Sequence, residues 1–264
     1  MPHAIDTHAH LNDPRLLPQL EPVLARAHAA GLTDIIVVGY DVASSETAVR
    51  LAQEHPALWA TVGLHPHDAE QATPQARRRL RELARSPRVV AIGETGLDFY
   101  RDLSPRQAQR DALRWHLELA RELDLPVVLH SRETQEELLA IVAEYRDLRL
   151  NWHCFDGTPE HAAAAVALGM HLGFGGMITY QKAEDLRRAL VQTPLDHMLL
   201  ETDAPYLAPK PNRRRDNEPD QILPIGERIA TLRGETPETV FAATTTNARR
   251  LFRLPPPAEA GGRP

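Results

Sequence analysis

Histidine and carboxylate side chains recur directly after short apolar segments of this sequence, and these residue types bind divalent metal ions. His8 and His10 follow the apolar start of the chain as a His-x-His pair. Residues two apart on an extended segment point the same way, so both imidazoles can reach one ion. Four further residues end later apolar segments: Glu94, His130, His153 and Asp203. Hydrogen bonds alone would hardly satisfy so many imidazoles and carboxylates at one place, so we predict a metal centre built from all of them.

The number of these ligands predicts two metal ions. A catalytic ion usually takes three protein ligands and a water, so the full set suggests two ions that share one carboxylate. Glu94 is the best bridge because a carboxylate has two oxygens. A carbamylated lysine is excluded, since Lys182 and Lys210 are the only lysines and neither is near the fourth or fifth apolar segment. Water between two ions becomes acidic enough to act as a nucleophile, and Asp203 can serve as general base as well as ligand.

Strands that end at the same edge of one sheet must position these side chains. Short apolar segments alternate with longer helical patterns, which indicates βαβ units and a parallel sheet. We predict an α/β fold, a closed (β/α)8 barrel of the TIM type, because no glycine-rich phosphate loop follows the first strand and barrel active sites form at the carboxyl ends of the strands. The predicted strands are Ala4–His8, Asp34–Gly39, Leu58–Gly63, Val89–Glu94, Pro126–His130, Leu148–His153, His171–Gly176 and Met198–Asp203.

Helix and loop signals complete this expected organisation. A helical pattern follows the last strand, which predicts an extra C-terminal helix after the barrel. The Pro- and Arg-rich segment Ala204–Asp220 is too long for an ordinary loop, and long loops at this end of a barrel are usually functional. We expect residues 1–254 to form a single catalytic domain and residues 255–264 to be a disordered tail. Helix starts are predicted at Ser104-Pro105, Thr158-Pro159 and Thr236-Pro237.

Composition limits the environment and the substrate. The formal net charge of −6 gives no long-range attraction to nucleic acid, so a polyanionic substrate would need local arginines or bound cations. Cys154 is the only cysteine, which excludes an intrachain disulfide and favours a reducing, cytoplasmic location. No segment approaches the roughly 20 apolar residues of a membrane helix, and we expect neither a signal peptide nor contact with a membrane. No obligate protein partner is evident.

The segments that carry these residues resemble the TatD family of metal-dependent deoxyribonucleases, which are amidohydrolase-like barrels. The motifs occur in the family's order from about residue 4 to about residue 220, and together they are highly specific. One departure is His116, where glutamine is common in the family. The matching segments are Asp6-Thr-His-Ala-His10, Gly63-Leu-His-Pro-His67, Gly93-Glu-Thr-Gly-Leu-Asp98, Pro126-Val-Val-Leu-His-Ser-Arg132, His153-Cys-Phe-Asp-Gly157, Glu201-Thr-Asp-Ala-Pro205 and Asn217-Glu-Pro219.

The resemblance implies hydrolysis of DNA phosphodiester bonds, often as an exonuclease that acts from the 3′ end. It also implies a division of the ligands between two ions. One ion would be held by His8, His10, Glu94 and Asp203, and the other by Glu94, His130 and His153. Mg²⁺ or Mn²⁺ commonly supports the family's activity, whereas mixed histidine and carboxylate ligands suit Zn²⁺ or Mn²⁺ better than Mg²⁺. The identity of the metal therefore stays open.

Three acidic residues are expected to support the metal ligands from behind. Asp6 shares a strand face with His8, and Glu201 shares one with Asp203, so both carboxylates should point into the barrel. Each would either orient a ligand histidine or form a buried salt bridge. Asp98 is a similar candidate.

Substrate contacts are expected from cationic and imidazole side chains near the site. Arg132 follows His130 by two residues and could reach the scissile phosphate as a permanently charged donor. His65 could donate to a phosphate oxygen or to the leaving group, whereas we assign His67 a structural role. The long loop adds a run of arginines that could hold phosphates: Arg213, Arg214 and Arg215.

Three functions are compatible with these residues. The first is a DNase that acts on single-stranded ends, because a barrel mouth admits one strand more readily than a duplex. The second uses the same metals to hydrolyse an amide or ester, such as a lactone or an aminoacyl ester on RNA. The third is a binding protein on a degenerate barrel, against which the complete ligand set argues. The arginines favour a phosphate substrate, so we predict the DNase.

Overall fold

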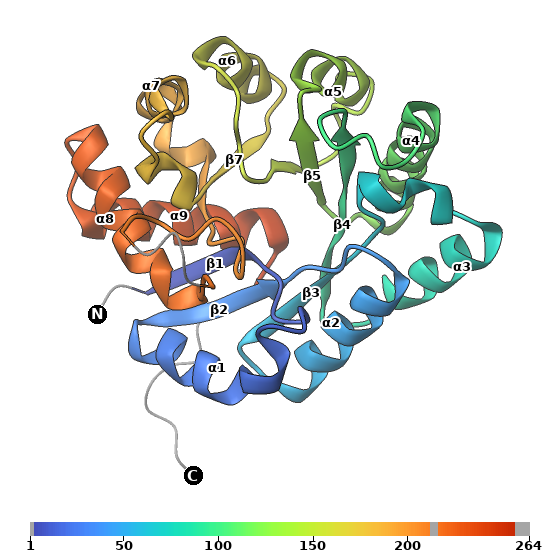
Figure 1. Cartoon of the computed structure of the whole chain (residues 1–264), viewed down its shortest axis with the longest axis horizontal. Helices are drawn as coiled ribbons and strands as arrows, with labels where there is room; N and C mark the ends of the chain where they lie inside the picture. Colours follow the sequence, from blue (N-terminus) through green and yellow to red (C-terminus); the bar gives the residue numbers. More distant parts are fainter. Residues whose placement is uncertain (1–2, 212–215, 257–264) are drawn as a thin grey trace.

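The computed structural model describes residues 3–211 and 216–256, and its strands form the predicted barrel (Figure 1). Eight parallel strands follow one another around the sheet in chain order. The Asp203 amide donates to His8 O at 2.9 Å, and the His10 amide donates to Ala204 O at 2.6 Å, so the last strand closes onto the first. The strands are β1 (Ala4–Ala9), β2 (Leu32–Val37), β3 (Leu58–Val62), β4 (Val89–Asp98), β5 (Val127–Arg132), β6 (Leu150–Trp152), β7 (His171–Phe174) and β8 (Met198–Leu200).

Several strand ends differ from the prediction: β6, β7 and β8 stop before the predicted His153, Gly176 and Asp203, whereas β4 and β5 run on. Both strands continue past the predicted ligands, because Gly96 pairs with His130 and the ladder runs on to Asp98 and Arg132. Gly96 has a φ of +150°, and a Cβ there would lie 1.9 Å from His130 O, so only glycine allows this close pairing. Glu94 therefore lies within a strand and not at its end, which fixes its backbone on both sides.

Helices surround the strands on the outside of the barrel (Figure 1). Thr158 and Thr236 cap their helices as predicted. The helix expected from Ser104 begins later, at Arg106, since the Ser104 hydroxyl instead donates to His67 O at 2.7 Å. The helices are α1 (Leu20–Ala29), α2 (Val42–Glu54), α3 (Pro74–Leu83), α4 (Arg106–Leu123), α5 (Gln135–Val142), α6 (Pro159–Ala167), α7 (Glu184–Gln192), α8 (Ile222–Arg233) and α9 (Pro237–Phe252).

Helix α9 is the predicted extra C-terminal helix, and it packs at the amino-terminal ends of the strands. Arg249 on this helix binds Asp34 of β2 at 2.7 Å, and Thr245 donates to His3 O at 2.8 Å. Ala248, Leu251 and Phe252 of α9 join a buried apolar cluster with side chains of β1, β2, β3, β4, β5 and β8. Apolar packing therefore fills this end of the barrel, and the opposite, carboxyl end is left for polar side chains.

Candidate metal centre at the mouth of the barrel

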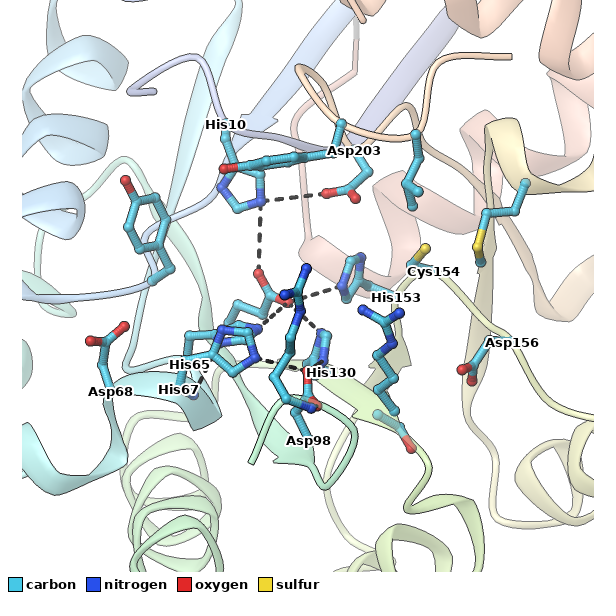
Figure 2. Close-up of a pocket in the computed structure, with 18 residues that line it drawn as sticks. His10, His65, His67, Asp68, Asp98, His130, His153, Cys154, Asp156 and Asp203 are labelled. Atoms are coloured by element: carbon cyan, nitrogen blue, oxygen red, sulfur yellow. Dashed lines mark hydrogen bonds and ion pairs between the residues drawn. The ribbon is translucent and has the colours of Figure 1, made fainter. Parts of the chain in front are cut away.

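The predicted ligands converge around the Glu94 carboxylate at the carboxyl end of the strands. Figure 2 shows four of them, His10, His130, His153 and Asp203, grouped at the mouth of the barrel. Glu94 Oε2 lies 3.4 Å from His8 Nε2 and 3.8 Å from His10 Nε2. Glu94 Oε1 lies 3.0 Å from both His130 Nδ1 and His153 Nε2. Each carboxylate oxygen thus faces its own pair of imidazoles, which is the arrangement expected of a carboxylate between two ions.

Asp203 lies beside His8 and His10, the two predicted ligands at the end of β1. Its Oδ1 lies 3.4 Å from His10 Nε2 and 3.7 Å from His8 Nε2. The residue has a φ of +57°, and its amide hydrogen bond to His8 O holds it directly beside β1. The chain leaves β8 at Leu200, so this carboxylate is positioned by the loop and its bonds to β1 rather than by the sheet ladder.

The donor set fits a divalent metal ion. One ligand atom from each of His8, His10 and Glu94 lies within 4.8 Å of the others. The buried Nδ1 atoms of His8 and His10 have no hydrogen-bond partner among the described residues, so no competing bond turns their Nε2 atoms away from the cluster. Imidazole nitrogens and carboxylate oxygens together suit Zn²⁺ or Mn²⁺.

The charges of the cluster are strongly coupled. Burial raises the pKa of Glu94, but the surrounding imidazoles, foremost that of His153, outweigh it and hold this pKa well below its usual range. Burial likewise opposes ionisation of Asp203, but its bond to His10 lowers its pKa. Burial lowers the pKa values of the histidines, yet the carboxylates prevail and raise those of His10, His130 and, most strongly, His153. A metal ion must displace these protons, so its affinity should fall as the pH falls.

The three supporting carboxylates have different partners. Asp98 Oδ2 lies 3.3 Å from His130 Nε2, and Glu201 Oε1 lies 3.5 Å from His153 Nδ1, so both face the outer nitrogens of predicted ligands. Asp6 differs from the expectation. It accepts the amides of His8 and Thr202 and the Thr202 hydroxyl, and among the described residues it has no hydrogen bond or ion pair to an imidazole. It links the backbone of β1 to the segment that follows β8, and burial raises its pKa to about 7.

His65 lies directly beside the cluster. Its Nε2 is 3.6 Å from Glu94 Oε1, and its Nδ1 accepts the amide of His67 at 3.1 Å. Because Nδ1 is an acceptor, the hydrogen of the neutral imidazole is on Nε2, which therefore donates into the site. The Nε2 of His67, for which we predict a structural role, is 2.8 Å from Asp98 Oδ2, and its ring lines the mouth (Figure 2).

The cluster opens into a cavity of about 710 Å³. Arg132, the predicted substrate contact, is among the residues that line it, and its guanidinium lies 3.8 Å from the centre of the Tyr100 ring. Arg101 also lines the cavity, and sequence reasoning missed it because an arginine in a loop after a strand has no distinguishing pattern. Neither arginine pairs with a carboxylate among the described residues. The run Arg213, Arg214 and Arg215 lies outside the residues that the structure describes.

Two further residues of the mouth were not predicted as site residues. Cys154 lines the cavity, and burial raises the pKa of its thiol well above the usual value, so the thiol stays neutral. Tyr206 also lines it, and its hydroxyl donates to Asp13 at 3.1 Å while Arg15 lies 4.4 Å above its ring. These contacts hold the loop that follows β8 against the loop that follows β1.

No described helix combines the length and the apolar character needed to cross a lipid bilayer.

Residues 5–253 match a family model described as TatD related DNase. The chain is 37% identical over 251 residues to an uncharacterized metal-dependent hydrolase, YabD, of Bacillus subtilis, covering 94% of this chain and 98% of that protein. It is 38% identical over 257 residues to the 3′-5′ ssDNA/RNA exonuclease TatD of Salmonella typhimurium, with the same coverage of 94% and 98%.

Solved structures show the same architecture. The structure of YjjV, a TatD homologue from Escherichia coli K12, superposes with a TM-score of 0.91 at 34% identity and covers 96% of this chain and 98% of that one. An organophosphorus hydrolase variant from Deinococcus radiodurans superposes with a TM-score of 0.67 at 15% identity, covering 94% and 92%. The second similarity concerns the barrel fold alone.

Proposed function

The chain belongs to the TatD-related DNase family of metal-dependent hydrolases, and from that premise we propose that it is a 3′-5′ exonuclease that acts on single-stranded DNA. It is an enzyme that hydrolyses ester bonds. The observation that carries the proposal is the position of Glu94, with one oxygen toward His8 and His10 and the other toward His130 and His153. Relatives named as exonucleases supply the single-stranded substrate and the polarity.

Two divalent ions, Mg²⁺, Mn²⁺ or Zn²⁺, are part of the proposal. His8, His10, Glu94 and Asp203 would hold one, and Glu94, His130 and His153 the other. Bound there, divalent ions polarise a phosphate oxygen and make an attacking water more acidic. A single cysteine and a nucleic acid substrate are both consistent with a cytoplasmic location, which we propose as well.

The chain's own residues would perform the remaining steps. Asp203 accepts a proton from the attacking water, whose oxygen bonds to phosphorus as the bond from phosphorus to the 3′ oxygen breaks, and the leaving 3′ oxygen takes a proton from solvent water to become a hydroxyl. His65 donates a hydrogen bond from Nε2 to the leaving oxygen or to a phosphate oxygen. Arg132 and Arg101 hold the phosphate, since their guanidinium groups line the cavity without a carboxylate partner among the described residues. The products are a 5′-mononucleotide and a strand one nucleotide shorter.

The experiment is hydrolysis of single-stranded DNA labelled at the 3′ or the 5′ end. Protein stripped of metal is assayed with Mg²⁺, Mn²⁺ or Zn²⁺, beside Glu94→Ala and with RNA as a second substrate. We expect the 3′ label to be released as a mononucleotide and the 5′-labelled strand to shorten stepwise. The activity of Glu94→Ala should fall by more than about 100-fold. This loss exceeds the roughly 10- to 100-fold that is usual when only a residue behind a metal ligand is removed.

Two results would overturn this proposal. Full activity of Glu94→Ala would exclude the bridging role of that carboxylate. No cleavage of any nucleic acid by protein that binds two ions would favour the alternative, hydrolysis of an amide or ester at the same metal centre.

A further inference from the structure

Glu201 is a fully buried carboxylate directly behind the metal centre. It lies two residues before Asp203, and its side chain has no exposed surface. Oε1 accepts the backbone amide of Cys154 and lies 3.5 Å from His153 Nδ1. Oε2 has no hydrogen-bond partner among the described residues. A buried carboxylate oxygen without a donor is costly, so this one requires an explanation.

Two predicted ligand histidines lie against each other beside this carboxylate. The rings of His8 and His153 are stacked, with centroids 3.7 Å apart and planes inclined by 15°. Each directs Nε2 toward Glu94, at 3.4 Å and 3.0 Å. The Nδ1 atoms of both rings are buried and make no hydrogen bond within the described part of the chain. His8, His153 and Glu201 also offer ligand atoms that lie within 4.8 Å of one another.

The group of His8, His153 and Glu201 has two possible roles. It could bind a third cation, or Glu201 could accept hydrogen bonds from the two imidazoles. A neutral imidazole that binds an ion through Nε2 carries its hydrogen on Nδ1. An Nδ1–H group repels a cation and seeks an acceptor. Because both Nε2 atoms face Glu94, the Nδ1–H group on the opposite side of each ring is a free hydrogen-bond donor. The Glu201 carboxylate beside the two rings is the complementary acceptor.

We propose that Glu201 is a positioning residue shared by the two metal sites, which receives the Nδ1–H groups of His8 and His153 on its two oxygens. His8 is a proposed ligand of one ion and His153 of the other, so one carboxylate orients both sites and couples them. This inference rests on the ligand set of the proposed function. It names no new ion and predicts that the protein binds two ions and not three.

Gly173 of β7 provides the space that this carboxylate needs. A Cβ on Gly173 would lie 2.1 Å from Glu201 Oε2 and 2.6 Å from the carboxyl carbon. Any larger residue must therefore displace the carboxylate from its position. This gives a second way to test the inference, which leaves the chemical groups of Glu201 and of both histidines intact.

The test is equilibrium dialysis of metal-stripped protein against Zn²⁺ buffered by a competing chelator. Glu201→Gln and Gly173→Ala should each still bind two equivalents, with both dissociation constants raised by about 10- to 100-fold, as is typical when the outer partner of a ligand is lost. The double variant should be no weaker than the weaker single variant, because both changes remove the same contact. Co²⁺ absorption spectra should change at both sites.

The matched control is Asp34→Asn. Asp34 is also a buried carboxylate, but it accepts from Trp59 Nε1 at 2.9 Å and from Arg249 at 2.7 Å at the other end of the barrel. This variant should lose stability and keep both dissociation constants. Should Glu201→Gln fail to fold, Gly173→Ala carries the test.

The possible outcomes separate this inference from the proposed function. Weakening of one site only, of neither site, or equal weakening in Asp34→Asn overturns the shared role of Glu201 and leaves the metal centre in place. Wild-type protein that takes up a third equivalent also overturns it. Wild-type protein that binds no ion overturns the proposed function, and the inference with it.

Discussion

Glu94 divides the imidazoles of the site into two groups. In His130 and in His153, one ring nitrogen faces Glu94 and the other faces a second carboxylate. His130 directs Nδ1 at Glu94 and Nε2 at Asp98, whereas His153 directs Nε2 at Glu94 and Nδ1 at Glu201. Because a neutral imidazole has one donor and one acceptor, the outer carboxylate decides which nitrogen is free for a metal. The chemistry of His130 and of His153 therefore depends on a carboxylate from another part of the chain.

The two arginines of the mouth lead to a prediction about substrate binding. Arg101→Ala and Arg132→Ala should raise KM for oligonucleotides more than they lower kcat, because a phosphate contact acts in the bound state as well as in the transition state. Each should reduce the salt dependence of binding by about one unit of slope. Arg114→Ala, which removes an exposed ion pair with Glu144 at 2.7 Å, is the control. An unchanged slope in both mouth variants would show that neither arginine contacts phosphate.

Asparagine side chains hold the chain on both sides of β8, Asn247 where the strand begins and Asn217 in the segment that follows it. Asn217 donates to Thr202 O at 2.7 Å and to Tyr206 O at 2.8 Å, which fixes the loop that carries Asp203. Asn247 of α9 donates to Leu195 O at 2.8 Å and to Met198 O at 2.9 Å, at the start of the same strand. Both asparagines are buried, and each donates to two backbone carbonyls.

Because the two asparagines make the same kind of contacts, their substitutions form a matched pair. Asn217→Ala and Asn247→Ala should each lower the free energy of unfolding by about 1–3 kcal/mol, since both leave buried carbonyls without a donor. Only Asn217→Ala should also weaken metal binding and activity, by about tenfold or more, because it releases the loop that positions Asp203. Urea denaturation and Zn²⁺ dialysis measure the two effects. Equal metal affinities in the two variants would contradict the assigned role of this loop.

The whole barrel separates stability from chemistry. Apolar packing against α9 fills the amino-terminal end, and the ionisable cluster is confined to the carboxyl end. Some titratable groups nevertheless lie in the packed layers. His116 of α4 is fully buried, accepts the Leu64 amide at 3.1 Å, and burial lowers its pKa to about 4. Burial lowers the pKa of His171 to about 4 as well.

These buried histidines predict a loss of stability in acid. In the unfolded chain a histidine binds its proton near pH 6.5, whereas folded His116 stays neutral down to about pH 4. Between these values the unfolded state binds more protons, so the free energy of unfolding falls as the pH is lowered through this window. The full contribution of His116 is on the order of 3 kcal/mol.

The measurement compares urea denaturation of wild-type protein and His116→Gln at about pH 7.5 and about pH 5, with a chelator present. Glutamine keeps an acceptor for the Leu64 amide but has no proton to gain. The variant should therefore lose less stability than the wild type between the two pH values. An identical loss in both proteins would exclude His116 as a source of the acid sensitivity.

The sequence by itself was sufficient for the barrel and for the convergence of the predicted ligands at one end of it. Periodicity marks each apolar strand, and ligands placed at strand ends must meet once parallel strands close into a barrel, because all their carboxyl ends face one side. His8, Glu94 and Asp203 therefore converge although they are far apart in the chain. The predicted ends of β4 and β5 were wrong, since their continuation depends on pairing between Gly96 and His130, which no local pattern reveals.

Only the tertiary structure decided which partner each polar side chain meets. Asp6 and Glu201 follow the same local pattern, yet Asp6 binds backbone amides and Glu201 faces an imidazole. Arg101 could not be distinguished from other surface arginines, because its significance comes from the cavity it lines and from the lack of a carboxylate partner in the described structure. Residue type and spacing determine which groups reach the mouth of the barrel, whereas distances between strands determine which of them interact.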